Sequence, residues 1–125
     1  MLVDAPGASM KVLVVDDNPE ILDLFCTGLS LAGFLVTVAQ SGFAALSMAP
    51  EQDAIVTDID MPGMTGVELI DRIRATRGDT LPVVIVTGLC SAEVRQTAAT
   101  RSCAVLDKPC DPITLVETLR TLLAA

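Results

Sequence analysis

The 125-residue sequence contains no histidine, tryptophan or tyrosine, and aromatic residues make up only 2% of it. Without histidine, the chain lacks the side chain that most often serves as the general base in nucleophilic catalysis. Its four cysteines form no Cys-x-x-Cys pair, so the sequence favours neither a zinc site nor a disulfide framework. Carboxylates, lysine and hydroxyl groups are therefore the side chains available for any chemistry.

Long hydrophobic runs and an excess of positive charge are also missing. No apolar stretch has the length of a membrane span and no signal-peptide pattern is present, so we expect a cytoplasmic location without a membrane partner. The formal net charge of −8 argues against direct binding to nucleic acid, because phosphate backbones select basic surfaces. Hydrophobic residues make up 51% of the chain, which is enough for the core of one globular domain.

Residues 1–10 are rich in alanine, glycine, proline and serine without periodicity, which predicts a flexible leader before a single domain at 11–125. Beyond the leader, strand and helix patterns alternate five times. Apolar runs predict strands at 12–15, 35–39, 54–56, 82–87 and 104–107, and capped amphipathic segments predict helices after each. The alternation predicts an α/β fold with a doubly wound parallel sheet of five strands and five helices.

A helix is predicted from Gly66 to about Arg77, with an apolar face towards the core and a basic face towards solvent. Val67, Ile70 and Ile73 are expected to face the core. The basic residues of this helix are expected to form a solvated face near its C-terminal end; they are Arg72, Arg74 and Arg77.

The stretch from Asp53 to Gly63 is the centre of the sequence. A short buried strand ends in acid at Asp58, and Pro62-Gly63 predicts a turn directly after it. Asp58 thus lies where a strand stops and a loop begins, at the sheet edge where parallel α/β proteins bind ligands. Taken alone, Asp58 fits equally well as an ordinary loop acid or a helix cap.

Four of the predicted strands end in, or lead directly into, polar residues and a glycine, namely Asp16-Asp17, Asp58, Thr87-Gly88 and Lys108. Because the carboxyl ends of parallel strands meet at one edge, we expect these side chains to converge there. Three crowded carboxylates repel one another without a cation, and oxygen ligands of this kind suit Mg²⁺. A lysine, a hydroxyl and a glycine amide then suit a phosphoryl group, for which aspartate is a recognised acceptor.

The series Asp16-Asp17, Asp58 in Asp-x-x-Met-Pro-Gly, Thr87-Gly88 and Lys108-Pro109 resembles the receiver domain of two-component response regulators, from about Lys11 to Leu123. The resemblance implies the flavodoxin-like receiver fold, with strand order 2-1-3-4-5. It also implies a phosphoacceptor signalling domain in a two-component phosphorelay. Such a domain is no enzyme beyond its self-catalysed phosphotransfer and dephosphorylation.

The resemblance further implies a role for each matched residue. Asp58 would accept a phosphoryl group from a sensor histidine kinase or a histidine phosphotransfer protein. Asp17 would bind Mg²⁺ directly and Asp16 through water, together with Asp58 and the backbone carbonyl of Asp60. The phosphoryl oxygens would be contacted by Lys108, Thr87 and Gly88. The Lys108-Pro109 bond is usually cis in the family.

Two positions depart from the receiver pattern. Val105 and Cys110 stand where receivers usually carry aromatic residues. Because valine has one stiff χ angle, it cannot report phosphorylation by turning a ring inward. We therefore expect the response in the loop after Thr87 and in the weakly held helix from Ser91 to Arg101, followed by altered contacts with a downstream protein.

A small apolar surface is predicted beside the site. Ile21 and Leu24 lie off the core face of the first helix, and Pro109 follows the catalytic lysine position. We interpret these residues as a docking face for the kinase or phosphotransfer protein. Scattered surface hydrophobics of no functional meaning are the alternative interpretation.

Two other functions are alternatives to the signalling role. Asp58-Ile-Asp60 fits the Asp-x-Asp signature of haloacid-dehalogenase-type phosphatases, which also form an aspartyl phosphate. That signature normally follows the first strand, however, and this chain has no room for a cap. A flavin-binding electron carrier is disfavoured because tryptophan, tyrosine and a glycine-rich phosphate loop after the first strand are all lacking.

Overall fold

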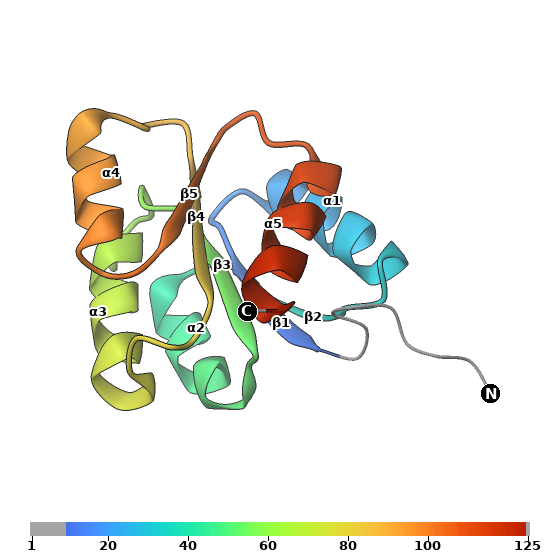
Figure 1. The fold of residues 1–125 in the computed structure, drawn as a ribbon, viewed down its shortest axis with the longest axis horizontal. Coiled ribbons are helices and arrows are strands. Elements are labelled where there is room, and N and C mark those ends of the chain that lie inside the picture. The colour runs from blue at the N-terminus through green and yellow to red at the C-terminus, as the bar shows by residue number, and fades with distance from the viewer. Residues whose placement is uncertain (1–9, 125) are drawn as a thin grey trace.

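The computed structural model describes residues 10–124, which form five parallel strands and five α-helices (Figure 1). The strands are β1 (Lys11–Val15), β2 (Leu35–Ala39), β3 (Ala54–Thr57), β4 (Val83–Thr87) and β5 (Ala104–Asp107). Their order in the sheet is β2-β1-β3-β4-β5 and every neighbouring pair is parallel, which confirms the predicted doubly wound sheet. Residues 1–9 of the predicted leader lie outside the described residues. The carbonyl of Met10 accepts a hydrogen bond from the Leu35 amide (2.9 Å).

The helices pack on both faces of the sheet. They are α1 (Pro19–Leu31), α2 (Gly42–Met48), α3 (Gly66–Arg77), α4 (Ala92–Ala99) and α5 (Pro112–Ala124), with a 3₁₀ turn at Ala49–Glu51 after α2. Helices α1 and α5 cover one face, and α2, α3 and α4 lie on the other (Figure 1). Each helix begins at a side-chain cap whose oxygen accepts a hydrogen bond from a backbone amide of the first turn, namely Asn18, Ser41, Thr65, Ser91 and Asp111.

An apolar core layer lies on each face of the sheet. Alternate strand residues, such as Leu13, Ile55 and Ile85, pack towards α2 and α3, while Val14 and Val56 pack towards α1 and α5. Because both faces are covered, the central strands are continuous apolar runs, as is usual for parallel sheets. No helix within residues 10–124 combines the length and hydropathy needed to cross a membrane.

Helix α3 differs from the sequence-based expectation in its core face and in its arginines. Leu69, which was not predicted to be buried, lies in the core beside Ile70 and Ile73, whereas Val67 is only half-buried. The predicted solvated face is wrong for Arg74 and Arg77, because both guanidinium groups donate to backbone carbonyls of neighbouring loops. Arg74 donates to Gly78, Leu81, Arg101 and Ser102, and Arg77 donates to Ala49, Pro50 and Gln52.

Candidate functional site

The carboxyl ends of β1, β3, β4 and β5 surround one open pocket of about 470 Å³. Its lining comprises Asp16, Asp17, Asn18, Asp58, Asp60, Thr87, Gly88, Leu89 and Lys108. The structure therefore brings together every residue that was predicted to bind the metal or the phosphoryl group. It adds Asn18 and Leu89, which no sequence motif assigns to the site. Their only sequence signal was adjacency to predicted site residues.

Lys108 is the electrostatic centre of the pocket. Its Nζ donates to Oδ2 of Asp16 and to Oδ2 of Asp58, both at 2.8 Å. The two carboxylate residues are buried, at 3% and 8% exposure, and the lysine is half-buried. Partial burial works against the ammonium charge, but the hydrogen bonds and charges of Asp16 and Asp58 outweigh it and raise the pKa of Lys108. Lys108 therefore stays protonated at neutral pH, and it contacts two carboxylates in addition to the contact with phosphoryl oxygens that the resemblance implies.

Asp58 is held in place by its own loop. Its Oδ1 accepts from the amide of Ile59 (2.7 Å), and its backbone amide donates to the carbonyl of Val15 (3.1 Å). Its carbonyl accepts from the buried hydroxyl of Thr57 (2.8 Å). Gly66 passes so close to the same carbonyl that a Cβ at this position would overlap its oxygen. These contacts orient the Asp58 carboxylate before any ligand binds.

Three carboxylates crowd the pocket. Asp16, Asp17 and Asp58 each offer an oxygen within 4.8 Å of the others, and the exposed Asp60 lies on the same lining. Both oxygens of Asp16 already accept hydrogen bonds, from Lys108 Nζ and from the amide of Asn18. Asp17 is exposed. This oxygen-only set fits a hard divalent cation, with Asp17 the more accessible ligand.

Thr87 and Gly88, at the end of β4, also line the pocket. Thr87 is fully buried, and its hydroxyl oxygen accepts from the amide of Leu89 (3.1 Å). The amide of Lys108 donates to the Thr87 carbonyl (2.9 Å), which ties the ends of β4 and β5 together. The Lys108-Pro109 peptide bond is cis, as the resemblance implied. Val105, which replaces the usual aromatic, is half-buried and is paired with Ile85 of β4.

The predicted docking residues lie outside this pocket lining. On α1, Ile21 is half-buried and packs against the core, while Leu24 is 48% exposed. Pro109 is exposed after β5. Their role in docking stays a prediction.

The fold and the site together define a doubly wound α/β domain with an acidic, lysine-bridged pocket at the carboxyl edge of its sheet. A family model described as the response regulator receiver domain matches residues 12–120. The chain belongs to this family, whose members are signalling domains that receive phosphate from histidine kinases. The phosphatase alternative finds no support, since its signature would follow the first strand and Asp58 follows β3.

Individual relatives agree with this assignment. An uncharacterised 14.6 kDa protein of Leptolyngbya boryana is 42% identical over 114 residues, which cover 87% of this chain and 86% of that protein. The transcriptional regulatory protein PrrA of Mycobacterium tuberculosis is 40% identical over 95 residues, which cover 74% of this chain but only 40% of PrrA. The structure of the chemotaxis protein CheY4 of Vibrio cholerae superposes with a TM-score of 0.85 at 34% identity, covering 92% of this chain and 99% of CheY4.

Proposed function

We propose that residues 11–125 are a phosphoacceptor receiver domain of a two-component phosphorelay, in which Asp58 accepts a phosphoryl group from a sensor histidine kinase or a histidine phosphotransfer protein. One observation carries this proposal. Lys108 Nζ lies 2.8 Å from Asp58 Oδ2, inside a pocket that also holds Asp16, Asp17 and Thr87. Phosphorylation then alters contacts with a downstream protein. This exchange is expected in the cytoplasm.

The proposed transfer uses the residues of the pocket directly. A carboxylate oxygen of Asp58 forms a bond to phosphorus as the bond from phosphorus to the donor imidazole nitrogen breaks, and the electron pair of that bond returns to the imidazole. In this proposal Lys108, the Thr87 hydroxyl and the Gly88 amide donate to the phosphoryl oxygens, which is supported by the fact that all three residues line the pocket. Transfer and later hydrolysis at Asp58 are the only catalysis proposed.

The acidic cluster is proposed to hold Mg²⁺, with Asp17 as the direct ligand, Asp16 acting through water, and Asp58 and the carbonyl of Asp60 completing the set. The carboxylate oxygens within 4.8 Å of one another support this fit. When bound, the ion supplies positive charge that offsets the crowded carboxylates and the phosphoryl oxygens.

The direct test of the proposed function is phosphorylation of the purified chain by acetyl phosphate in the presence of Mg²⁺. Intact-mass spectrometry is expected to show one added phosphoryl group per chain, and chelation of Mg²⁺ is expected to prevent it. Steady turnover of a phosphomonoester without a stable adduct would instead identify a phosphatase. An unmodified chain would contradict the phosphoacceptor role.

Asp17→Ala is expected to lower Mg²⁺ affinity by at least about tenfold and to reduce phosphorylation by acetyl phosphate in parallel. In the absence of Mg²⁺, the variant should unfold at a higher temperature than the original chain, because one repelling carboxylate has been removed. Mg²⁺ titration followed by calorimetry measures the first effect. The exposed Asp79 lies in the loop before β4, so Asp79→Ala serves as the matched control. Unchanged Mg²⁺ affinity in Asp17→Ala would rule out Asp17 as a direct ligand.

Leu24→Asp tests the predicted docking face. The charge should slow transfer from the protein phosphodonor by about tenfold, the usual scale for an apolar contact at an interface, and leave the rate with acetyl phosphate unchanged. Phe43→Asp is the control, since Phe43 is 62% exposed and lies on α2, across the sheet from α1. Equal slowing with both donors would mean that Leu24 stabilises the fold and does not contact the protein phosphodonor.

Helix α4 is expected to carry the response to phosphorylation. Ala98 is the one residue of α4 that is buried, and Val105 offers no ring that could turn inward. In hydrogen exchange with Mg²⁺ and beryllofluoride as a phosphoryl mimic, protection should rise across residues 88–103 and change little in α1 and α2. The Asp58→Asn variant under the same conditions is the control. An unchanged 88–103 segment beside a response on another face would contradict this route.

A further inference from the structure

The peptide unit between Asp58 and Ile59 is held at both of its polar ends. Its carbonyl, on Asp58, accepts a hydrogen bond from the Thr57 hydroxyl at 2.8 Å. Its amide, on Ile59, donates to Oδ1 of the Asp58 carboxylate at 2.7 Å. Because a peptide unit is planar and rigid, a group that fixes the carbonyl also fixes the direction of the N–H. The Thr57 hydroxyl is therefore coupled to the Asp58 carboxylate through one peptide unit.

The carbonyl of Asp58 lies past the end of the strand ladder. The last residue pairs of β3 are formed by Thr57, with Val15 of β1 and with Ile85 of β4. Gly66 packs directly against the Asp58 carbonyl, where a Cβ would overlap the oxygen. A carbonyl enclosed in this way needs a donor from the protein, because an unpaired buried acceptor costs free energy. The Thr57 hydroxyl supplies that donor.

Packing alone does not explain a hydroxyl at position 57. Thr57 is 0% exposed and ends a strand whose other residues, Ala54, Ile55 and Val56, are apolar and buried. Since side chains alternate along a strand, Thr57 shares the face of Ile55, which belongs to the core layer against α2 and α3. Valine has nearly the same shape and would fill this position without burying a polar group. The use of the hydroxyl is therefore its bond to Asp58.

The backbone after Asp58 is held a second time, at the next residue. The Gly66 amide donates to the carbonyl of Ile59 at 2.8 Å. The carbonyls of two successive residues are thus bound, which restricts rotation of the backbone on the side of Asp58 that leads to Asp60. The orientation of the Asp58 carboxylate is set by these bonds together with the bond from Lys108 Nζ to Oδ2 at 2.8 Å.

We propose that Thr57 is a positioning residue for phosphoryl transfer, whose hydroxyl fixes the Asp58–Ile59 peptide so that the Ile59 amide holds Oδ1 while Oδ2 faces Lys108. The proposal rests on the phosphoacceptor role of Asp58 and adds a residue that does not line the pocket. A nucleophile held in one orientation reacts faster, because its reacting atom is already aligned. Without the hydroxyl, the carboxylate takes up further orientations, and the rate of transfer falls although the phosphodonor still binds.

Two substitutions at position 57 separate the hydroxyl from the shape of the side chain. Thr57→Val removes the hydroxyl and keeps a β-branched side chain that suits a strand, whereas Thr57→Ser keeps the hydroxyl. With acetyl phosphate and saturating Mg²⁺, the maximum rate of labelling should fall by about tenfold in Thr57→Val, the scale found for residues that orient a reacting group. The acetyl phosphate concentration at half-maximal rate should not change. Thr57→Ser should restore the rate.

Amide hydrogen exchange measured by NMR reports the position of the peptide itself and needs no phosphodonor. In Thr57→Val the Ile59 amide should exchange faster relative to the amides of β4, because its bond to Oδ1 of Asp58 is no longer held in line. In Thr57→Ser the relative exchange of the Ile59 amide should match that of the original chain. Circular dichroism verifies that each variant is folded.

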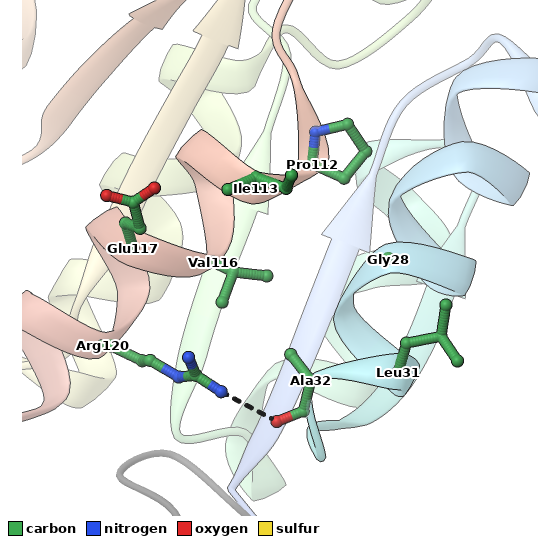
Figure 2. A pocket seen from close by; sticks show the side chains of 8 residues that line it. All are labelled: Gly28, Leu31, Ala32, Pro112, Ile113, Val116, Glu117 and Arg120. Carbon is green, nitrogen blue, oxygen red and sulfur yellow. Dashed lines mark hydrogen bonds between the residues drawn. The ribbon is translucent and has the colours of Figure 1, made fainter.

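A groove of about 560 Å³ between α1 and α5 offers the control for a general loss of stability (Figure 2). Leu31 and Val116 line it, and Arg120 Nη2 donates to the carbonyl of Ala32 there at 3.2 Å. The groove shares no lining residue with the acidic pocket. Val116→Ala removes buried methyl groups and should lower stability. It should leave the maximum rate of labelling and the relative exchange of the Ile59 amide unchanged.

Three results would overturn the positioning role. They are labelling of Thr57→Val at the original maximum rate, a loss in Thr57→Ser as large as that in Thr57→Val, and equal slowing in Val116→Ala. An original chain that acetyl phosphate does not label would instead contradict the phosphoacceptor role. The exchange of the Ile59 amide decides the positioning role in that case too, since an unchanged value in Thr57→Val would overturn it.

Discussion

Asp58→Asn is expected to abolish phosphorylation by both acetyl phosphate and a protein phosphodonor. An amide cannot form the acyl phosphate, so labelling should fall to background. The fold should survive, because the asparagine oxygen can still accept the 2.7 Å hydrogen bond from the Ile59 amide and Lys108 keeps its contact with Asp16. Intact-mass spectrometry and a thermal melt measure the two effects.

Asp60→Asn provides the matched control for this substitution. Asp60 lines the same pocket and is exposed, and its proposed contribution is a backbone carbonyl that the substitution leaves in place. The Asp60→Asn chain should therefore still be labelled. Labelling of Asp58→Asn at the level of the original chain would show that another residue is the acceptor.

Lys108→Met is expected to lower both stability and phosphorylation. The substitution leaves the carboxylates of Asp16 and Asp58 without their shared cation, and breaking a buried ion pair typically costs about 3 kcal/mol or more. The half-exposed position of Lys108 reduces that penalty, so we expect about 1–2 kcal/mol in denaturant unfolding without Mg²⁺. Added Mg²⁺ should restore more stability to the variant than to the original chain. Labelling by acetyl phosphate should slow by about a hundredfold, as when a charge-stabilising donor is removed.

The free energy of unfolding should depend on pH through the contacts of Lys108 with the carboxylates of Asp16 and Asp58. Because its neighbours raise the pKa of Lys108, the stabilisation is complete below the ordinary lysine value of 10.5 and is lost as pH rises through the raised pKa.

Lys11→Met, which changes the other lysine of the chain at an exposed position on β1, is the control for Lys108→Met and should leave labelling by acetyl phosphate unchanged. Equal loss of labelling in both variants would contradict a specific role for Lys108.

The convergence of the site was predictable from sequence because of a rule of topology. Asp16, Asp58 and Lys108 follow predicted strands and Thr87 ends one, and parallel strands bring such positions to one edge. The strand order itself came from the family resemblance, since apolar runs do not reveal which strands are neighbours. The order observed in the sheet agrees with it.

The pairing of Lys108 with Asp16 was not predicted, and the reason is physical. Sequence patterns show where side chains emerge from strands, but not which ones hydrogen-bond across 92 positions of sequence. The arginines of α3 illustrate the same limit. A basic residue near a helix end resembles a solvated one until loops from elsewhere place carbonyls within its reach, as happens at Arg74 and Arg77.

The groove between α1 and α5 could not be predicted from the sequence either. In the sequence, Leu31 is one apolar residue near the end of a predicted helix, and nothing in its position indicates a groove. Its proximity to Val116 and Arg120 depends on how α1 packs against α5 through Gly28 and Pro112, which is a tertiary contact. Residues that define surfaces between helices therefore required the structure.

Locating the modification on the original chain shows whether Asp58 is the phosphoacceptor. The chain is incubated with acetyl phosphate and Mg²⁺, reduced with borohydride, which converts an aspartyl phosphate to homoserine, and then sequenced by tandem mass spectrometry. Phosphoryl transfer to Asp58 predicts homoserine at position 58 alone and none when Mg²⁺ is chelated. Homoserine at Asp16, Asp17 or Asp60 with an unmodified Asp58 would contradict it.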